Sequence, residues 1–169
     1  GVVLNPPALG SYGIDVQAAN VTLKSFTLNG HGTGDTYGLK ISGDAVIADV
    51  QDITVDNFYR SGFDFNGLNG LTLKNIISTN ADWGVGVGLT DVSNAALENI
   101  TTSGNVWGGI AIYTRSYHHP GSVTDSIVLQ GVNSISEANP IFVELDPYDG
   151  STLTFKPATN ISLAGYPFM

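Results

Sequence analysis

Short apolar phrases recur along the chain about every two dozen residues, and each has apolar residues at alternate positions. They read GIDV (13–16), GLKI (38–41), GFDF (62–65), GVGV (84–87) and GIAI (109–112), with PIFV (140–143) as a degraded sixth copy. Alternation with a period of two is typical of a β-strand. A repeat of this length indicates units that each bury an apolar face against the next.

A second alternating phrase follows each of the first five. It reads VTLKSF (21–26), ITVDNF (53–58), LTLKNI (71–76), AALENI (95–100) and IVLQGV (127–132). Two strands per repeat, with no helical segment between them, predict parallel coils stacked about 4.8 Å apart. We therefore predict an all-β fold, one parallel β-helix of about six coils. The coils occupy 12–145, after a lead-in over 1–11 and before a capping tail over 146–169.

The second phrase ends at a polar corner residue. Aligning the phrases places Asn57, Asn75 and Asn99 at this corner on successive coils. Stacked amides hydrogen-bond as a ladder, and asparagine tolerates the left-handed backbone of a sharp corner. The residue before the corner alternates in charge, which would pair opposite charges on adjacent strands. This row is Lys24, Asp56, Lys74, Glu98 and Gln130.

Composition narrows the classes of function. Of the 169 residues only 12% are charged, the net charge is −9 and the sequence pI is about 4.3, which disfavours a nucleic-acid partner. No apolar run is long enough to span a bilayer, and there is no cysteine. An acidic chain rich in Gly, Thr and Asn favours an extracellular or cell-surface protein. Because the chain does not begin with Met, we expect a mature protein or a piece of a larger one. The lead-in over 1–11 is too short to cap the first coil, which predicts an adjoining domain or subunit there.

These phrases resemble those of the right-handed parallel β-helix proteins, the pectate-lyase-like superfamily, over nearly the whole chain. SGFDFN (61–66) occupies the register of the catalytic YGFDPH-like motif of mannuronan C5-epimerase modules, to which the chain is most similar. Asp64 matches the family Asp, Ser61 stands near the family Tyr, and Asn66 replaces the family His. RSYHHPG (115–121) is similar to a loop that those modules carry. The chain equally resembles repeat modules of bacterial surface proteins, which leaves catalysis open.

The outward face of the first phrase is the candidate site. Asp15, Lys40 and Asp64 fall on three consecutive coils and would lie side by side. A lysine between two carboxylates could act as a base or neutralise a uronate carboxylate, with Asp as acid or metal ligand. The two carboxylates would raise the pKa of the lysine, which disfavours a neutral base. The alternative is a row of surface ion pairs. Beyond Asp64, Gly86, Gly88 and Ala111 leave the face almost bare. This bare stretch predicts a shallow groove or a flat packing surface.

A loop over 114–126 supplies further candidates. Arg115 could hold a carboxylate and His118 could transfer protons, so both join the catalytic candidates. A solvated loop without a function is the alternative. We also predict that five residues contact carbohydrate: Tyr59, Asn66, Tyr113, Tyr117 and His119.

Aromatic residues precede the glycine that opens a strand on four coils, at Tyr12, Tyr37, Trp83 and Trp107. Tyr12 shares its parity with Ile14, so we expect these rings to stack at a corner of the core rather than to bind sugar.

Calcium is the one ion that the sequence suggests. The carboxylates of Asp49, Asp52 and Asp56, or the turn over 146–150, could bind it through oxygen atoms. No other cofactor and no defined metal site is predicted. Two functions follow from the sequence. One is a structural or adhesive extracellular module that binds polysaccharide. The other is a lyase or C5-epimerase acting on uronate polymers such as alginate.

Overall fold

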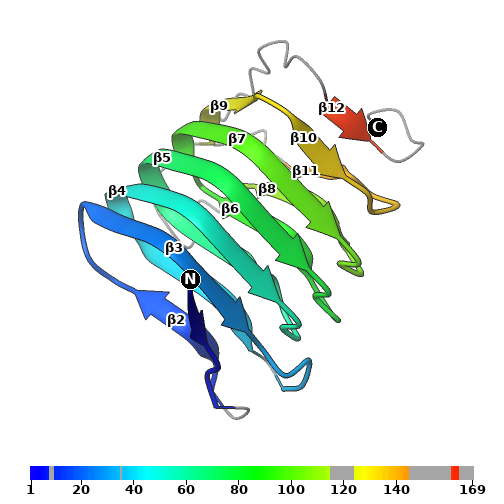
Figure 1. Cartoon of the computed structure of the whole chain (residues 1–169). Coiled ribbons are helices and arrows are strands. Elements are labelled where there is room, and N and C mark those ends of the chain that lie inside the picture. The colour runs from blue at the N-terminus through cyan, green and yellow to red at the C-terminus, as the bar shows by residue number, and fades with distance from the viewer. Residues whose placement is uncertain (8–9, 35, 115–123, 145–160, 164–169) are drawn as a thin grey trace.

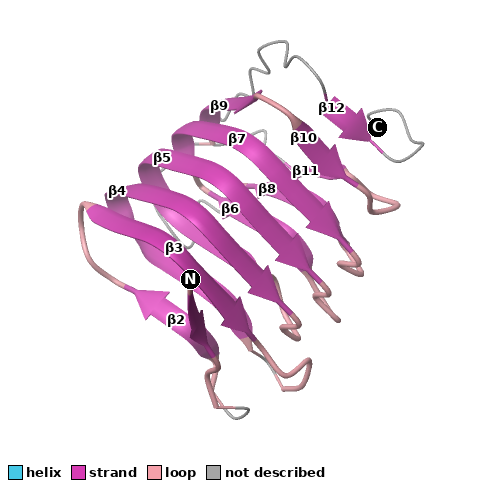
Figure 2. Ribbon diagram, in the orientation of Figure 1, coloured by secondary structure: helices cyan, strands magenta, loops and turns pink. Residues whose placement is uncertain are grey.

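The chain forms a parallel β-solenoid (Figures 1 and 2). The computed structural model describes residues 1–7, 10–34, 36–114, 124–144 and 161–163. All regular structure in these residues is β, in twelve strands of one sheet. Within this described part, no helix is long and apolar enough to cross a membrane.

The strands follow one another in two rows around the solenoid. They are β1 (Val2–Leu4), β2 (Tyr12–Val16), β3 (Val21–Asn29), β4 (Tyr37–Asp56), β5 (Phe63–Thr79), β6 (Val85–Thr90), β7 (Ser93–Ser103), β8 (Gly108–Tyr113), β9 (Asp125–Gln130), β10 (Asn133–Ile135), β11 (Ile141–Glu144) and β12 (Ile161–Leu163). The long strands β4 and β5 pass through a corner and belong to both rows.

The first strand row stacks the six recurring phrases. It consists of β2, the starts of β4 and β5, then β6, β8 and β11, all in parallel register. The pairing confirms the predicted all-β parallel solenoid. Complete turns number about four rather than six, because counting one coil per phrase also counts phrases at the two ends that do not close a full turn.

The second strand row stacks the second phrases. It contains β1, β3, the ends of β4 and β5, β7, β9 and β10, with β12 paired to β10. Leu23 pairs with Val50, Val50 with Leu73, and Leu73 with Leu97. These residues point inward and close the core from the second side.

The inward residues of the alternating strands fill the space between the two rows with aliphatic side chains and two phenylalanines. Phe63 and Phe65 are fully buried, and their rings stack with centroids 6.2 Å apart. Leu39 and Ile41 on β4 and Val87 and Leu89 on β6 flank them and are equally buried. The predicted inward positions of the first phrase are confirmed for β4 and β5, and for Val87 on β6.

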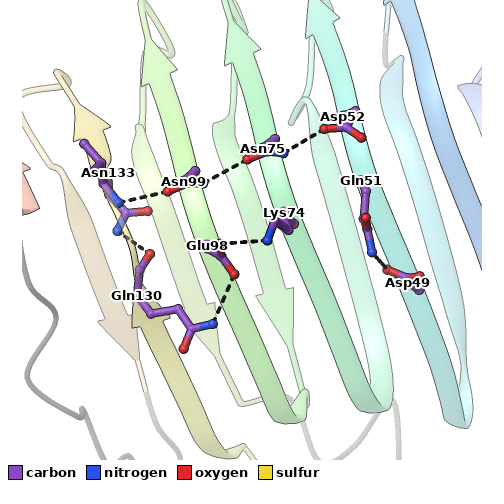
Figure 3. Close-up of polar contacts among 10 residues, drawn as sticks. Asp49, Gln51, Asp52, Lys74, Asn75, Glu98, Asn99, Gln130 and Asn133 are labelled. Atoms are coloured by element: carbon purple, nitrogen blue, oxygen red, sulfur yellow. Dashed lines mark hydrogen bonds and ion pairs between the residues drawn. The ribbon is translucent and has the colours of Figure 1, made fainter.

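The predicted corner ladder exists, but with a different first member (Figure 3). Asn75 Nδ2 donates to Asp52 Oδ1 at 2.7 Å, and Asn99 Nδ2 donates to Asn75 Oδ1 at 2.9 Å. Asn57 was wrongly placed in this row: it lies at the next corner, where its Nδ2 donates to Gly30 O at 3.4 Å. The letters of ITVDNF resemble those of LTLKNI, yet the strand pairing matches 48–53 with 71–76 because this register buries Val50 beside Leu73.

The same strand register corrects the predicted row of alternating charges. Gln51, not Asp56, lies between Lys24 and Lys74. Lys74 and Glu98 form the expected ion pair at 2.8 Å, and Gln130 Nε2 donates to Glu98 Oε2 at 3.3 Å (Figure 3). Lys24 instead pairs with Asp49 at 3.0 Å.

The aspartates considered for calcium do not converge. Asp49 accepts a hydrogen bond from Gln51 at 2.5 Å, Asp52 accepts one from Asn75, and Asp56 accepts one from Thr79 at 2.6 Å. Among the described residues, no group of three or more His, Cys, Asp or Glu side chains could hold a metal ion. The turn over 146–150 lies outside the described residues.

Candidate functional site

The outward residues of the first strand row form the candidate site, with one correction to their order. Asp64 pairs with Gly88, Gly88 with Ala111, and Ala111 with Phe142. Gly86 was wrongly placed beside Asp64; a Cβ there would lie 2.8 Å from Thr102 Cγ2, close to the core. The apolar alternation of β6 continues past the recurring phrase to Leu89, so Val87 and Leu89, rather than Val85 and Val87, face the phenylalanine layer.

A groove of about 660 Å³ opens on this outward face. Its middle is bare because Gly88 has no side chain, and a Cβ there would meet no heavy atom closer than 3.5 Å. Asp64 and Asn66 of β5 and Thr90 of β6 add polar groups beside Gly88. The groove extends from Lys40 on β4 to Phe142 on β11.

Trp83 and Trp107 form a tryptophan wall along one side of the groove. They lie in the turns before β6 and β8, with ring centroids 5.9 Å apart and ring planes tilted by 56°. Their exposed fractions are 49% and 48%. The expectation that these rings stack in the core was therefore wrong, since the turn that precedes each strand points them outward.

The tyrosines that begin β2 and β4 do stack. The rings of Tyr12 and Tyr37 are 5.7 Å apart and both residues are half-buried. Lys40 Nζ lies 5.1 Å from the Tyr12 ring centroid and 5.5 Å from that of Tyr37, while Arg60 also lies over Tyr37, at 5.8 Å. Tyr37, Lys40 and Arg60 together form the cationic and aromatic end of the groove.

A second aromatic pair borders the groove where the strands end. Tyr113 ends β8 and its ring lies 5.6 Å from the ring of Phe142 on β11. Phe142 is 43% exposed, and Glu144 follows it at the end of β11. Aromatic rings therefore flank the bare floor, the tryptophans from the turns before β6 and β8, and Tyr113 and Phe142 from within β8 and β11.

Lys40 and Asp64 form an ion pair at 3.4 Å on the paired strands β4 and β5. Burial raises the pKa of the Asp64 carboxyl, and Lys40 opposes this rise. Burial lowers the pKa of the Lys40 ammonium, but Asp64 and the nearby tyrosines outweigh that effect, so its pKa is raised. Lys40 is thus held as a cation unsuited to act as a base, and Asp64 is favoured as an acid.

Asn66 stands one outward position beyond Asp64 on β5. It lies close enough to help lower the pKa of the Asp64 carboxyl, yet its buried Nδ2 makes no well-formed hydrogen bond to any described residue. A buried amide donor without a partner costs free energy, so a ligand oxygen arriving at this point would be favoured.

The structure brings together part of the predicted site. Lys40, Asp64, Asn66 and Tyr113 all line the groove. Asp15 pairs in register with Lys40, but it is exposed, accepts a hydrogen bond from Gln17 Nε2 at 2.8 Å and is not among the lining residues.

Other predicted site residues lie elsewhere. Tyr59 is half-buried and contributes its carbonyl, which accepts from Trp83 N at 2.6 Å, while its side chain does not line the groove. The loop candidates lie outside the described residues: Arg115, Tyr117, His118 and His119.

Sequence reasoning gave no site role to several residues that line the groove, namely Arg60, Trp83, Trp107, Phe142 and Glu144. The available signal was the tryptophan before the opening glycine on two successive coils. Its interpretation depended on the direction of the turn, which alternation within the strand does not define.

Comparison with family models, with curated proteins and with solved structures finds no significant match to this chain. The parallel solenoid rests on its strand pairing. Membership of the pectate-lyase-like superfamily stays a prediction.

Proposed function

We propose that the protein is an extracellular or cell-surface β-helix module that binds a polysaccharide along the groove. The observation that carries this proposal is the pair of aromatic borders, Trp83 with Trp107 and Tyr113 with Phe142, on either side of the bare position Gly88. Aromatic rings pack against the apolar faces of sugar rings, and polar groups between them hydrogen-bond to hydroxyls.

The length of the groove favours a chain over a single sugar. It crosses from β4 to β11, four strand spacings or about 19 Å. Its charged lining residues balance, with two cations (Lys40 and Arg60) and two anions (Asp64 and Glu144), whereas the whole chain carries a net charge of −9. The groove is therefore less repulsive to an acidic polysaccharide than the rest of the surface.

Titration calorimetry with alginate, polygalacturonate and neutral glucan oligomers tests the proposal. We expect binding by at least one polymer, and at least a tenfold weaker affinity for Trp107→Ala, since a buried aromatic contact contributes more than about 1.4 kcal/mol. Ile77→Ala is the matched control, because Ile77 is 42% exposed and lies on the second strand row. Equal losses in both variants, or no binding to any oligomer, would contradict the groove as a polysaccharide site.

A second candidate function is a lyase or C5-epimerase acting on uronate polymers. The observation that favours it is the Lys40–Asp64 pair, in which a held cation could neutralise a uronate carboxylate beside an acid of raised pKa. Ultraviolet absorbance of unsaturated products and NMR of the uronate anomeric protons would reveal turnover. Turnover abolished by Lys40→Met establishes this candidate, while binding without turnover favours the module.

The first coil supports the proposal of an adjoining domain or subunit. Val2 and Leu4 of β1 pair with the inward Phe26 and Leu28 but are 61% and 38% exposed, and Ile14 and Val16 of β2 are incompletely buried. Inward apolar residues at an open strand edge favour a covering partner.

A further inference from the structure

A buried carboxylate lies in the turn between β10 and β11, in contact with β7 and with the turn that carries Trp107. Glu137 follows β10 and is only 5% exposed. Its Oε2 accepts from Thr102 Oγ1 at 2.7 Å and its Oε1 accepts from Asn105 Nδ2 at 2.5 Å. Among the described residues, none forms an ion pair with Glu137. Two neutral donors therefore hold a carboxylate that water would otherwise solvate.

Asn105 extends this network to the preceding coil. Its Nδ2 also donates to Ser78 O at 3.1 Å, and its Oδ1 accepts from Ala81 N at 3.0 Å. Ala81 stands two residues before Trp83, and Asn105 two residues before Trp107. One buried amide thus joins both turns that carry the tryptophan wall.

Backbone contacts tie these turns to one another and to the turn after β10. Val106 N donates to Ala81 O at 3.0 Å, and Trp107 N donates to Gly84 O at 3.0 Å. Asn139 Nδ2 donates to Trp107 O at 3.3 Å, two residues beyond Glu137. The three turns form one stack, with Asn105 and Glu137 on its inner side and the tryptophans on its outer side.

We propose that Asn105 and Glu137 are positioning residues that fix the tryptophan wall and thereby the affinity of the groove. Apolar residues of the same size could fill this space at a similar or lower free-energy cost, so stability alone does not explain a buried carboxylate. Hydrogen bonds are directional, and a fully paired network favours one arrangement of the turns over its alternatives. The effect on affinity rests on the proposed function; the effect on the wall does not.

The chain allows a direct measurement because its two tryptophans are both in the wall. Intrinsic fluorescence and its quenching by acrylamide therefore report on the wall with no ligand present. Asn105→Asp places a second carboxylate against Glu137 and removes both donor bonds of Nδ2. We expect at least a twofold change in the quenching constant and at least a tenfold loss of affinity for the bound polymer. Adding Glu137→Gln to Asn105→Asp supplies a new donor and should restore most of both.

Asn133→Ala is the matched control. Asn133 is also buried, but it lies in the second strand row, where its Oδ1 accepts from Ile100 N at 2.8 Å. It should lose unfolding stability without a change in quenching. An equal change in quenching for Asn133→Ala, or no rescue by the double substitution, overturns the proposal.

Thr102→Val covers the case in which Asn105→Asp does not fold. It deletes one donor to Glu137 with little change of shape, and an unchanged quenching constant overturns the proposal. Absence of polymer binding by the wild-type protein would defeat the proposed function alone. The ligand-free quenching series would still decide whether the network positions the wall.

Discussion

Lys40 Nζ lies 3.4 Å from Asp64 Oδ2 across the paired strands β4 and β5, and only 21% and 14% of the two side chains are exposed. Each charge is thus largely removed from water and depends on the other. Removing one partner of such a pair costs more than removing both, because the remaining charge stays desolvated.

We expect Lys40→Met to destabilise the fold by about 1–3 kcal/mol, below the range for a fully buried pair. The double variant with Asp64→Asn should lose less than the sum of the two single variants, with a coupling of about 1 kcal/mol. Urea denaturation of the four proteins measures this. Lys24→Met is the control, since the Lys24–Asp49 pair is more exposed, at 44% and 34%, and should have a smaller effect. Additive losses would show that the Lys40–Asp64 pair contributes nothing.

The pH dependence of stability should reveal the environment of Asp64. Burial raises its pKa, so the native state binds this proton more tightly than the unfolded chain. Its contribution to stability is complete below the ordinary Asp pKa of 3.8 and is lost as pH rises through the folded pKa. The free energy of unfolding of wild type minus that of Asp64→Asn should therefore fall as pH rises from about 3 to 7.

Asp49→Asn supplies a control of opposite sign. A hydrogen bond from Gln51 and the contact with Lys24 lower the pKa of Asp49. Its contribution is present above the unfolded pKa and is lost as pH falls, so the corresponding difference should rise with pH. If the difference between wild type and Asp64→Asn also rises with pH, then Lys40 lowers the pKa of Asp64 by more than burial raises it.

The corner ladder predicts a local cost for one asparagine. Asn75 has a left-handed φ of 53° and bonds to both Asp52 and Asn99. Asn75→Ala removes both bonds and places alanine in a disfavoured conformation, so we expect a loss of about 1–3 kcal/mol in urea denaturation. Lys74→Gln, one residue earlier and on the surface, should leave the midpoint nearly unchanged. Equal effects would show that the ladder adds nothing beyond the surface contact.

The bare floor of the groove predicts separable effects on binding and folding. Gly88→Val has room for its Cβ and should keep the thermal midpoint within a few degrees, while the added side chain weakens polysaccharide binding at least tenfold. Gly62→Ala is the contrasting control, because a Cβ there overlaps Ser78 Oγ and should destabilise the fold. Calorimetric binding and thermal unfolding measure the two effects. Wild-type affinity in Gly88→Val would place the ligand elsewhere.

The sequence predicted the strands correctly but aligned some of them wrongly with their neighbours in the stack. The six phrases, the parallel stacking and the buried Phe63 and Phe65 were all predicted. Errors arose where two alignments looked equally apolar, as at Val85 against Val87. A two-residue shift keeps every side chain on the same face, so alternation cannot detect it. Packing beside Phe63 detects it, because the strand must continue its apolar series to Leu89.

The sequence by itself determined the solenoid, since a period-two pattern repeated every two dozen residues leaves its apolar faces no partner except the neighbouring coil. It also placed Lys40 beside Asp64. Only the tertiary structure decided that Trp83 and Trp107 face outward and that Glu137 lies buried beneath them. The direction of the turns places the tryptophans outside and Glu137 inside. That direction depends on hydrogen bonds between residues far apart in the chain, such as those of Asn105 with Ala81 and Glu137.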